Sequence, residues 1–179
     1  GNLDQIRDIE DLISKFTFSE RTLILGSGFL LNLTLIPTLT GNNVGSRKKF
    51  YIFSDKLNHS SINYGCYLTR QKVIRYNHND LNHLEYLIKK TEKNIPKIII
   101  TETLFSMDGD LIDVNEFRSV AKKYNTFLYF DEAHAMGVYG KKGFGLTSDN
   151  KKYDNEIVVG TFGKAFGSYR AKVIKKIQK

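Results

Sequence analysis

The chain has 179 residues, of which 41% are hydrophobic, and this length and composition suit one globular domain with a sizeable core. Its formal net charge of +8 would suit nucleic acid or an acidic ligand, but the lysines occur as scattered pairs among acidic residues, which is typical of a solvated face. The lone Cys66 excludes an intramolecular disulfide and fits a reducing compartment. Residues 23–39 are apolar, but Gly, Asn and Pro interrupt them too often for a membrane span. From these observations together we expect a cytoplasmic protein that binds neither a membrane nor nucleic acid.

The first half of the chain alternates helical and extended patterns. Residues 6–16 place apolar side chains at helical spacing. A short apolar segment, 22–25, ends at Gly26-Ser27-Gly28, where a helix beginning at Phe29 would present free backbone N–H groups to an anion. A simple turn is the alternative there. A strand at 50–53 is expected next, followed by a polar stretch suited to a helix start.

The second half continues this alternation. The expected elements are, in order, a strand at 73–76, a helix at 81–88, a strand at 98–100, a helix at 114–124, and strands at 127–130 and 157–159. The pattern predicts an α/β fold with a three-layer, mostly parallel sheet. In such sheets ligands bind at the carboxyl ends of the strands. That rule brings together the polar residues that follow the strands, namely Ser106, Asp131, His134, Thr161 and Lys164.

The last expected strand ends in a glycine-punctuated turn, residues 160–167, with Lys164 in its middle. Glycines on both sides let a ligand approach the backbone closely while the amine points at it. Three interpretations compete: a phosphate-binding loop, a lysine that forms a Schiff base with a carbonyl cofactor, and an ordinary surface turn.

The first interpretation would make the chain an NTPase of the helicase kind, in which Asp131-Glu132-Ala133-His134 holds magnesium. It needs the loop G-x-x-x-x-G-K-[ST]. Here Val158 stands in place of the first glycine and Ala165 follows the lysine. The lysine turn also follows the acidic strand instead of preceding it. These departures disfavour the NTPase hypothesis.

The second interpretation fits pyridoxal phosphate, which needs a lysine for its aldehyde and an acid for its pyridine nitrogen. Lys164 and Asp131 are of the right types. The other candidates are His134 and Ser106 for the ring oxygen, Thr161 for the phosphate and His59 for the exposed ring face. Each alone has a plainer explanation, such as a helix cap or a satisfied core histidine. Their shared placement at strand ends favours a cofactor site.

Four motifs, in this order, resemble those of the α-oxoamine synthases, which are fold-type I pyridoxal phosphate enzymes. They are Asn58-His59-Ser60-Ser61, Thr101-Glu102 with Phe105 to Asp110, Asp131-Glu132-Ala133-His134-Ala135, and Gly160 to Gly167. Together they span nearly the whole chain. Within the family, residues 78–85 and the Thr-Phe-Gly-Lys form of the lysine motif look most similar to the 8-amino-7-oxononanoate synthases. The aminolevulinate, aminoketobutyrate, serine palmitoyl and autoinducer synthases are near alternatives.

The resemblance implies the large cofactor-binding domain of an aspartate aminotransferase-like fold, a pyridoxal 5'-phosphate cofactor, no metal, and a homodimer of the full-length protein. It also implies catalytic roles. Lys164 would hold the cofactor and act as general base, Asp131 would pair with the pyridine nitrogen, and His59 would stack on the ring. The remaining cofactor contacts implied are His134 and Ser106 at the ring oxygen, Thr161 at the phosphate, and the turn Ser27, Gly28 and Phe29. Glu102 matches a motif residue without an assigned role.

The implied reaction is a decarboxylating condensation of an amino acid, here L-alanine, with an acyl thioester, here pimeloyl-CoA or pimeloyl-carrier protein. The product would be 8-amino-7-oxononanoate, in biotin biosynthesis.

Two residues depart from the family pattern: Ser60 replaces a more usual alanine, and Arg170 replaces a usual glycine, which could distort the turn after the lysine. Residues 172–179 are expected to be a basic tail. Residues 1–179 are expected to be a partial large domain without the N-terminal arm and C-terminal small domain, and this segment alone is expected to be inactive.

Overall fold

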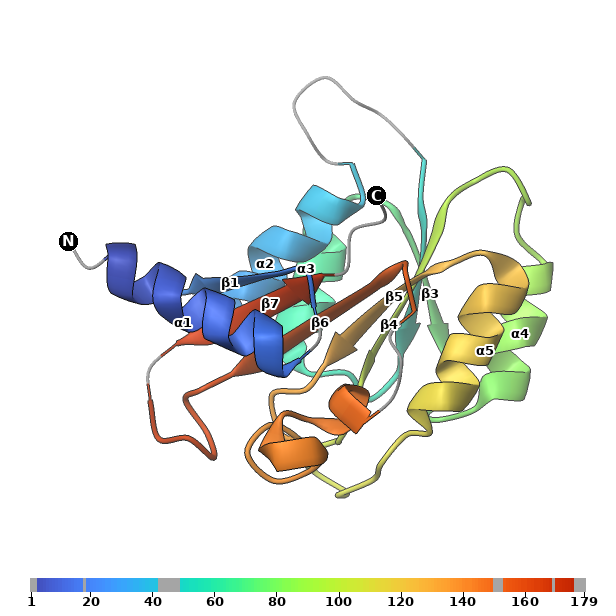
Figure 1. Ribbon diagram of the computed structural model, residues 1–179. Coiled ribbons are helices and arrows are strands. Elements are labelled where there is room, and N and C mark those ends of the chain that lie inside the picture. The colour runs from blue at the N-terminus through green and yellow to red at the C-terminus, as the bar shows by residue number, and fades with distance from the viewer. Residues whose placement is uncertain (1–2, 18, 42–48, 150–152, 169, 176–179) are drawn as a thin grey trace.

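The computed structural model describes residues 3–17, 19–41, 49–149, 153–168 and 170–175 (Figure 1). In this part of the chain the strands are β1 (Arg21–Leu25), β2 (Tyr51–Asp55), β3 (Lys72–Tyr76), β4 (Lys97–Glu102), β5 (Phe127–Asp131), β6 (Glu156–Thr161) and β7 (Ala171–Lys175). They form one seven-stranded sheet in the order β1-β7-β6-β5-β4-β2-β3. Strands β2 to β6 are parallel, whereas β7 runs antiparallel to both β1 and β6. The prediction of a mostly parallel α/β sheet is therefore confirmed.

Helices cover both faces of the sheet. They are α1 (Leu3–Phe16), α2 (Gly28–Leu39), α3 (Ser60–Leu68), α4 (Leu81–Lys89) and α5 (Val114–Tyr124). Because successive strand residues point to opposite faces, each central strand contributes to two separate cores. Ile99 and Leu128 pack with residues of α1, α4 and α5, whereas Ile98 and Tyr129 pack with residues of α2 and α3. The result is the three-layer arrangement in Figure 1.

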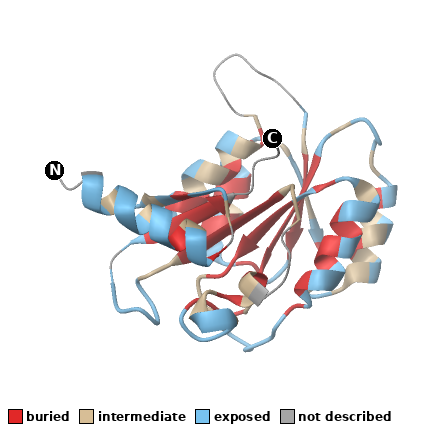
Figure 2. Cartoon of the chain, in the orientation of Figure 1, coloured by how far each residue is buried: buried red, intermediate tan, exposed pale blue. Residues whose placement is uncertain are grey.

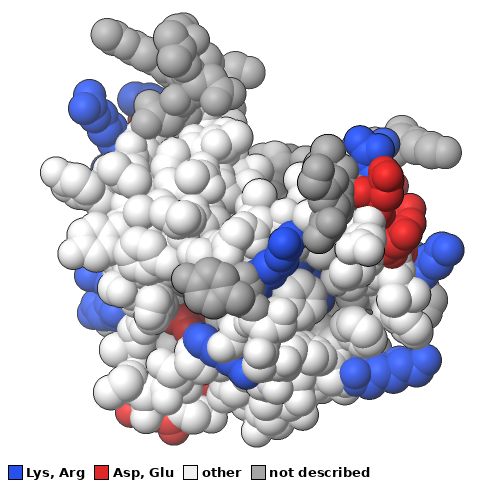
Figure 3. All heavy atoms as spheres, turned by 90° about the vertical axis from the view of Figure 1, so that its left-hand side faces the viewer, with Lys and Arg blue, Asp and Glu red and all other residues white. Residues whose placement is uncertain are grey.

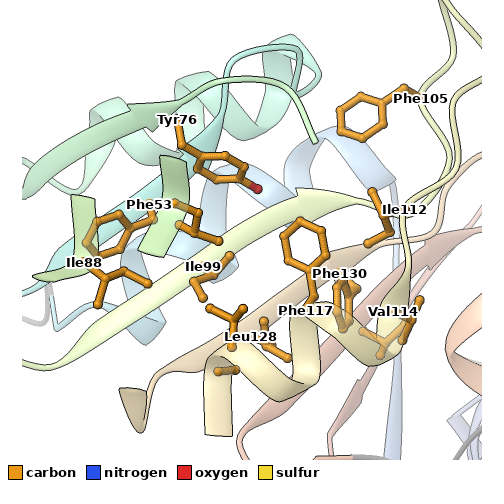
Figure 4. Close-up of a cluster of buried hydrophobic side chains, with 14 of the residues drawn as sticks. Phe53, Tyr76, Ile88, Ile99, Phe105, Ile112, Val114, Phe117, Leu128 and Phe130 are labelled. Atoms are coloured by element: carbon orange, nitrogen blue, oxygen red, sulfur yellow. The ribbon is translucent and has the colours of Figure 1, made fainter. Parts of the chain in front are cut away.

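The central strands β2, β4, β5 and β6 are almost completely buried between the helical layers, whereas most residues of the edge strands β1 and β3 are exposed or half-buried (Figure 2). Figure 4 shows the larger core, in which Phe117 of α5 and Phe130 of β5 meet edge to face with ring centroids 6.3 Å apart. On the outside, Lys and Arg side chains are scattered over the face shown in Figure 3. Within the described ranges, no helix is both long and apolar enough to cross a membrane.

Short polar side chains determine where the helices start. Asp80 caps α4 by accepting the His83 N–H at 2.8 Å, as its position before an apolar-periodic stretch predicts. Ser27 caps α2, and its Oγ accepts the Leu30 N–H at 3.2 Å. The helix start expected after Gly26-Ser27-Gly28 is therefore present. Its N-terminus lies beside Thr161, because a Cβ on Gly28 would be 3.6 Å from the Thr161 Cβ.

The expectation of a basic tail from residue 172 is wrong for the described part of that range. Residues 171–175 form β7, which pairs with β1 on one side and β6 on the other. Val173 and Ile174 alternate between the two cores, and Lys172 is fully buried. Strand pairing on both sides thus overrides the charged composition that suggested a tail. Residues 176–179 lie outside the described residues.

We predict that Gly65→Ala separates α2 from α3. A Cβ on Gly65 would lie 2.5 Å from the backbone oxygen of Asn32 and 3.0 Å from Ile36 Cδ1, so one helix must move. Overpacking of this kind costs about 1–3 kcal/mol of the free energy of unfolding, which urea denaturation would measure. Gly26→Ala is the control, because nothing lies within 4 Å of its Cβ position. Equal stability of the two variants would contradict this prediction.

Candidate active site

A cavity of about 170 Å³ opens at the carboxyl ends of β4, β5 and β6, beside the N-termini of α2 and α3. It brings together the predicted site residues Gly28, Phe29, His59, Asp131, His134, Thr161 and Lys164. Two predicted residues do not line it. Ser27 caps α2, and Ser106 lies in an exposed turn after β4. The cofactor contacts of both remain predictions.

Asp131 is the last residue of β5 and is only 5% exposed. Its Oδ1 accepts the Ala133 N–H at 2.9 Å, and its Oδ2 accepts an N–H of the Asn32 side chain, also at 2.9 Å. A buried carboxylate with a donor on each oxygen has a fixed orientation. Asp131 therefore presents a fixed negative group at the wall of the cavity.

Lys164 lies in the turn after β6, and its Nζ contacts Nε2 of His134. The loss of hydration on partial burial lowers the pKa of Lys164, although the charges of Asp131 and Glu102 oppose this change. Burial, and then the positive charge of Lys164, lower the pKa of His134. Both groups are thus shifted toward their neutral forms, and a neutral amine is the nucleophilic form of lysine.

His59 caps α3 at the cavity wall. Its Nδ1 accepts the Ser61 N–H at 3.2 Å, and the Ser61 Oγ lies 2.8 Å from the same nitrogen. The His59 backbone N–H donates to Oε1 of Glu102 at 2.5 Å. His59 is therefore fixed at two points: Ser61 contacts its imidazole, and Glu102 accepts a hydrogen bond from its backbone N–H.

Thr161 closes the cavity beside the start of α2. Its Oγ1 accepts the Gly163 N–H at 3.1 Å and donates to the Arg170 carbonyl at 3.3 Å. The N–H groups at a helix start favour an anion. The Arg170 carbonyl also accepts the Phe162 N–H at 2.6 Å. Arg170, which stands where glycine is usual, therefore takes part in this turn through its backbone carbonyl.

The sequence reasoning gave no role to Glu102 and did not name Asn32 or Ser61 as site residues, although all three line the cavity. Glu102 pairs in register with Asp131 and is 3% exposed. Burial and the neighbouring Asp131 charge raise the pKa of Glu102 to about 7. In the sequence, Asn32 could be noticed only as a single amide within an apolar helix. Ser61 could be noticed only as a hydroxyl two residues after His59, which caps α3.

The fold and this cavity define an α/β protein with a ligand site at the carboxyl ends of parallel strands, where a buried acid and a lysine meet. Residues 1–173 match the family model described as aminotransferase class I and II. The chain belongs to this family.

Curated relatives of similar sequence include 8-amino-7-oxononanoate synthases. The 8-amino-7-oxononanoate synthase of Gluconacetobacter diazotrophicus is 39% identical over 176 residues, covering 97% of this chain and 44% of the relative. A putative 8-amino-7-oxononanoate synthase of Haemophilus influenzae is 41% identical over 180 residues, covering 97% and 45%. The chain thus spans less than half the length of these relatives.

Solved structures show the same fold. The serine palmitoyltransferase of Sphingomonas wittichii has a TM-score of 0.88 at 29% identity, covering 98% of this chain and 43% of that one. The 8-amino-7-oxononanoate synthase of Francisella tularensis has a TM-score of 0.81 at 32% identity, covering 97% and 48%. A variant serine palmitoyltransferase from S. paucimobilis, with a TM-score of 0.85 at 29% identity and covering 95% and 43%, was solved with an aldimine of PLP (pyridoxal 5'-phosphate) and myriocin bound.

We predict that Glu102→Gln removes a pH dependence of stability. The folded-state pKa of Glu102, about 7, exceeds its ordinary value of 4.5, so the folded protein binds this proton more tightly than the unfolded chain. Wild-type stability should therefore fall as the pH rises from about 4.5 through about 7, by at most about 3 kcal/mol. The variant should be more stable than wild type at pH 8 and similar to it at pH 4, in chemical denaturation. The control is Glu116→Gln on the exposed face of α5, which should follow the wild-type curve.

Proposed function

We propose that the protein is a pyridoxal phosphate-dependent C-acyltransferase of the α-oxoamine synthase type. The observation that carries this proposal is the convergence of the Lys164 amine and the Asp131 carboxylate on one cavity. They come from different strand ends, and they supply the amine and the acid that the cofactor requires. We further propose that the full-length protein is a cytoplasmic homodimer.

The cavity fits this cofactor at three points. Asp131 is a buried acid that two donors hold in place, so it suits the role of acceptor for the N–H of the pyridine ring. The Lys164 amine has a lowered pKa, suited to bonding with an aldehyde. Thr161 and the start of α2 lie together, suited to a phosphate. When bound, pyridoxal phosphate supplies an electron sink for a carbanion at the α-carbon of an amino acid.

Each residue then has a physical task. Lys164 Nζ binds the cofactor and later takes the proton from the α-carbon of the amino acid. The negative charge of Asp131 keeps a proton on the ring nitrogen. His59 covers the ring and excludes water from it. His134 donates to the ring oxygen, and we assign Ser106, on the loop after β4, to the same oxygen.

The substrates are an amino acid and an acyl thioester, which condense with loss of carbon dioxide and release of the thiol. The relatives named 8-amino-7-oxononanoate synthase support L-alanine with pimeloyl-CoA or pimeloyl-carrier protein, as in biotin biosynthesis. The serine palmitoyltransferase neighbours make other substrate pairs, such as serine with a long-chain thioester, the alternatives to test.

We predict that Lys164→Ala abolishes covalent attachment of pyridoxal phosphate. Wild-type protein mixed with the cofactor should give, after borohydride reduction, a peptide labelled at Lys164 by mass spectrometry. Lys164→Arg keeps the positive charge but cannot form the bond, so it should fail as well. Lys89→Ala, on the exposed surface of α4, is the control and should label normally. A normal label in Lys164→Ala would refute the assignment of this lysine.

We predict that the protein expressed from its complete reading frame releases thiol fastest with L-alanine and pimeloyl-CoA. The panel combines alanine, glycine and serine with pimeloyl, acetyl, succinyl and palmitoyl thioesters, and free thiol and carbon dioxide are both measured. If another pair reacts fastest, the proposed reaction class stands, but the proposed substrates, L-alanine and pimeloyl-CoA, are wrong. Failure of every pair with cofactor-loaded protein would contradict the proposed activity.

A further inference from the structure

Asn32 is a buried polar residue, 3% exposed, in the otherwise apolar helix α2. Two of its side-chain partners, Asp131 and Ser61, line the candidate site. The Nδ2 atom donates to Asp131 Oδ2 at 2.9 Å and to Ser61 Oγ at 3.0 Å. The Oδ1 atom accepts the hydroxyl of Tyr129. An amide buried in an apolar layer costs stability unless it is hydrogen-bonded, so this position calls for an explanation.

The chemistry of the neighbours allows one orientation of this amide. Reversing it would aim Oδ1 at the Asp131 carboxylate, which only accepts hydrogen bonds. Burial, and then the charge of Asp131, raise the pKa of Tyr129 well above its ordinary value, so its hydroxyl stays a donor to Oδ1. Both amide hydrogens of Asn32 are therefore committed, one to Asp131 and one to Ser61.

This commitment leaves the hydroxyl hydrogen of Ser61 available for the next hydrogen bond. Because Ser61 Oγ accepts from Asn32, its own hydrogen is free to donate to His59 Nδ1, 2.8 Å away. The same nitrogen also accepts the Ser61 backbone N–H. Because both donors of Ser61 point at Nδ1, this nitrogen acts as an acceptor, and the imidazole hydrogen of His59 lies on Nε2.

The packing of α2 against α3 supports a built arrangement. Gly65 of α3 lies so close to Asn32 that an added Cβ would be 2.5 Å from the Asn32 carbonyl oxygen. This close approach brings Ser61 of α3 within hydrogen-bonding distance of the Asn32 amide.

We propose that Asn32 is a positioning residue that fixes the Asp131 carboxylate and, through Ser61, the tautomer of His59. One amide thus controls the group that faces the ring nitrogen and the group that covers the ring. The part that concerns cofactor binding rests on the function proposed above. The part that concerns His59 is a property of the protein without cofactor.

The first test is a double-mutant cycle on the dissociation constant of pyridoxal phosphate, measured by absorbance titration. Asn32→Leu keeps the approximate volume and removes every hydrogen bond. Loss of a hydrogen bond to a charged group should weaken binding by about ten- to a hundredfold. In the Asp131→Asn background the same change should raise the dissociation constant less than about threefold, because the charged acceptor is gone. Equal losses in both backgrounds would overturn the coupling between Asn32 and Asp131.

A pH series separates this role from a purely structural one. Asn32→Asp places a second carboxylate against Asp131, and this carboxylate donates only when protonated. Its affinity for the cofactor, relative to wild type at the same pH, should therefore recover as the pH falls. A ratio that does not change with pH would overturn the donor role of Asn32.

The second test is ¹⁵N NMR of the histidine side chains in cofactor-free protein, which contains four histidines. We expect His59 in wild type to be protonated at Nε2 alone. Asn32→Leu and Ser61→Ala should both produce a mixture of tautomers. Ser60→Ala changes an exposed neighbouring serine and should leave the wild-type signal. A protonated Nδ1 in wild type, or an unchanged tautomer in both test variants, would overturn the link to His59.

The outcomes distinguish the two proposals. If wild type fails to bind pyridoxal phosphate but the His59 tautomer responds to Asn32→Leu, the proposed function fails and the positioning of His59 by Asn32 stands. If wild type binds the cofactor at Lys164 and the cycle is additive, the coupling to Asp131 fails and the proposed function stands.

Discussion

The structure of the site depends on one constraint, which is the burial of the Asp131 carboxylate at the end of β5. A buried charge is tolerated only when donors satisfy it. One donor is local, the Ala133 N–H, and the other comes from Asn32 on a helix 99 residues earlier in the chain. Asn32 supplies the second donor because α2 packs over the neighbouring strands β6 and β7, from which its side chain reaches β5. The requirement for this one hydrogen bond thus ties the helical layer to the strand that carries the acid.

The residue after Asp131 anchors the opposite side of the same strand end. Glu132 is fully buried, and its carboxylate accepts both the backbone N–H and the hydroxyl of Thr147, at 2.8 and 3.2 Å. Two consecutive acids are therefore fixed, one toward the cavity and one into the loop at residues 137–149. This arrangement explains an acidic pair at the strand end without any metal or nucleotide, because each acid has its own set of donors.

The sequence predicts the parts of this structure that depend on local pattern. Apolar runs such as 98–100 and 127–130 identify buried strands, and Asp80 identifies a helix start, because both signals lie within a few residues. Strand β7 was missed because Lys172 and Lys175 suggest a solvated tail, and only pairing with β1 and β6 shows otherwise. The part played by Asn32 could not be predicted, since its partners at positions 61, 129 and 131 meet it only after folding.

The pairing of β4 with β5 places two carboxyl groups, Glu102 and Asp131, side by side at the cavity. Two buried acids at such positions do not both ionise readily. Asp131 receives two hydrogen bonds on its oxygens, whereas the bond to Glu102 comes from the His59 backbone. Burial, and then the charge of Asp131, raise the pKa of Glu102 to about 7. Near neutral pH Glu102 is therefore only partly ionised, and this reduces the negative charge beside Asp131.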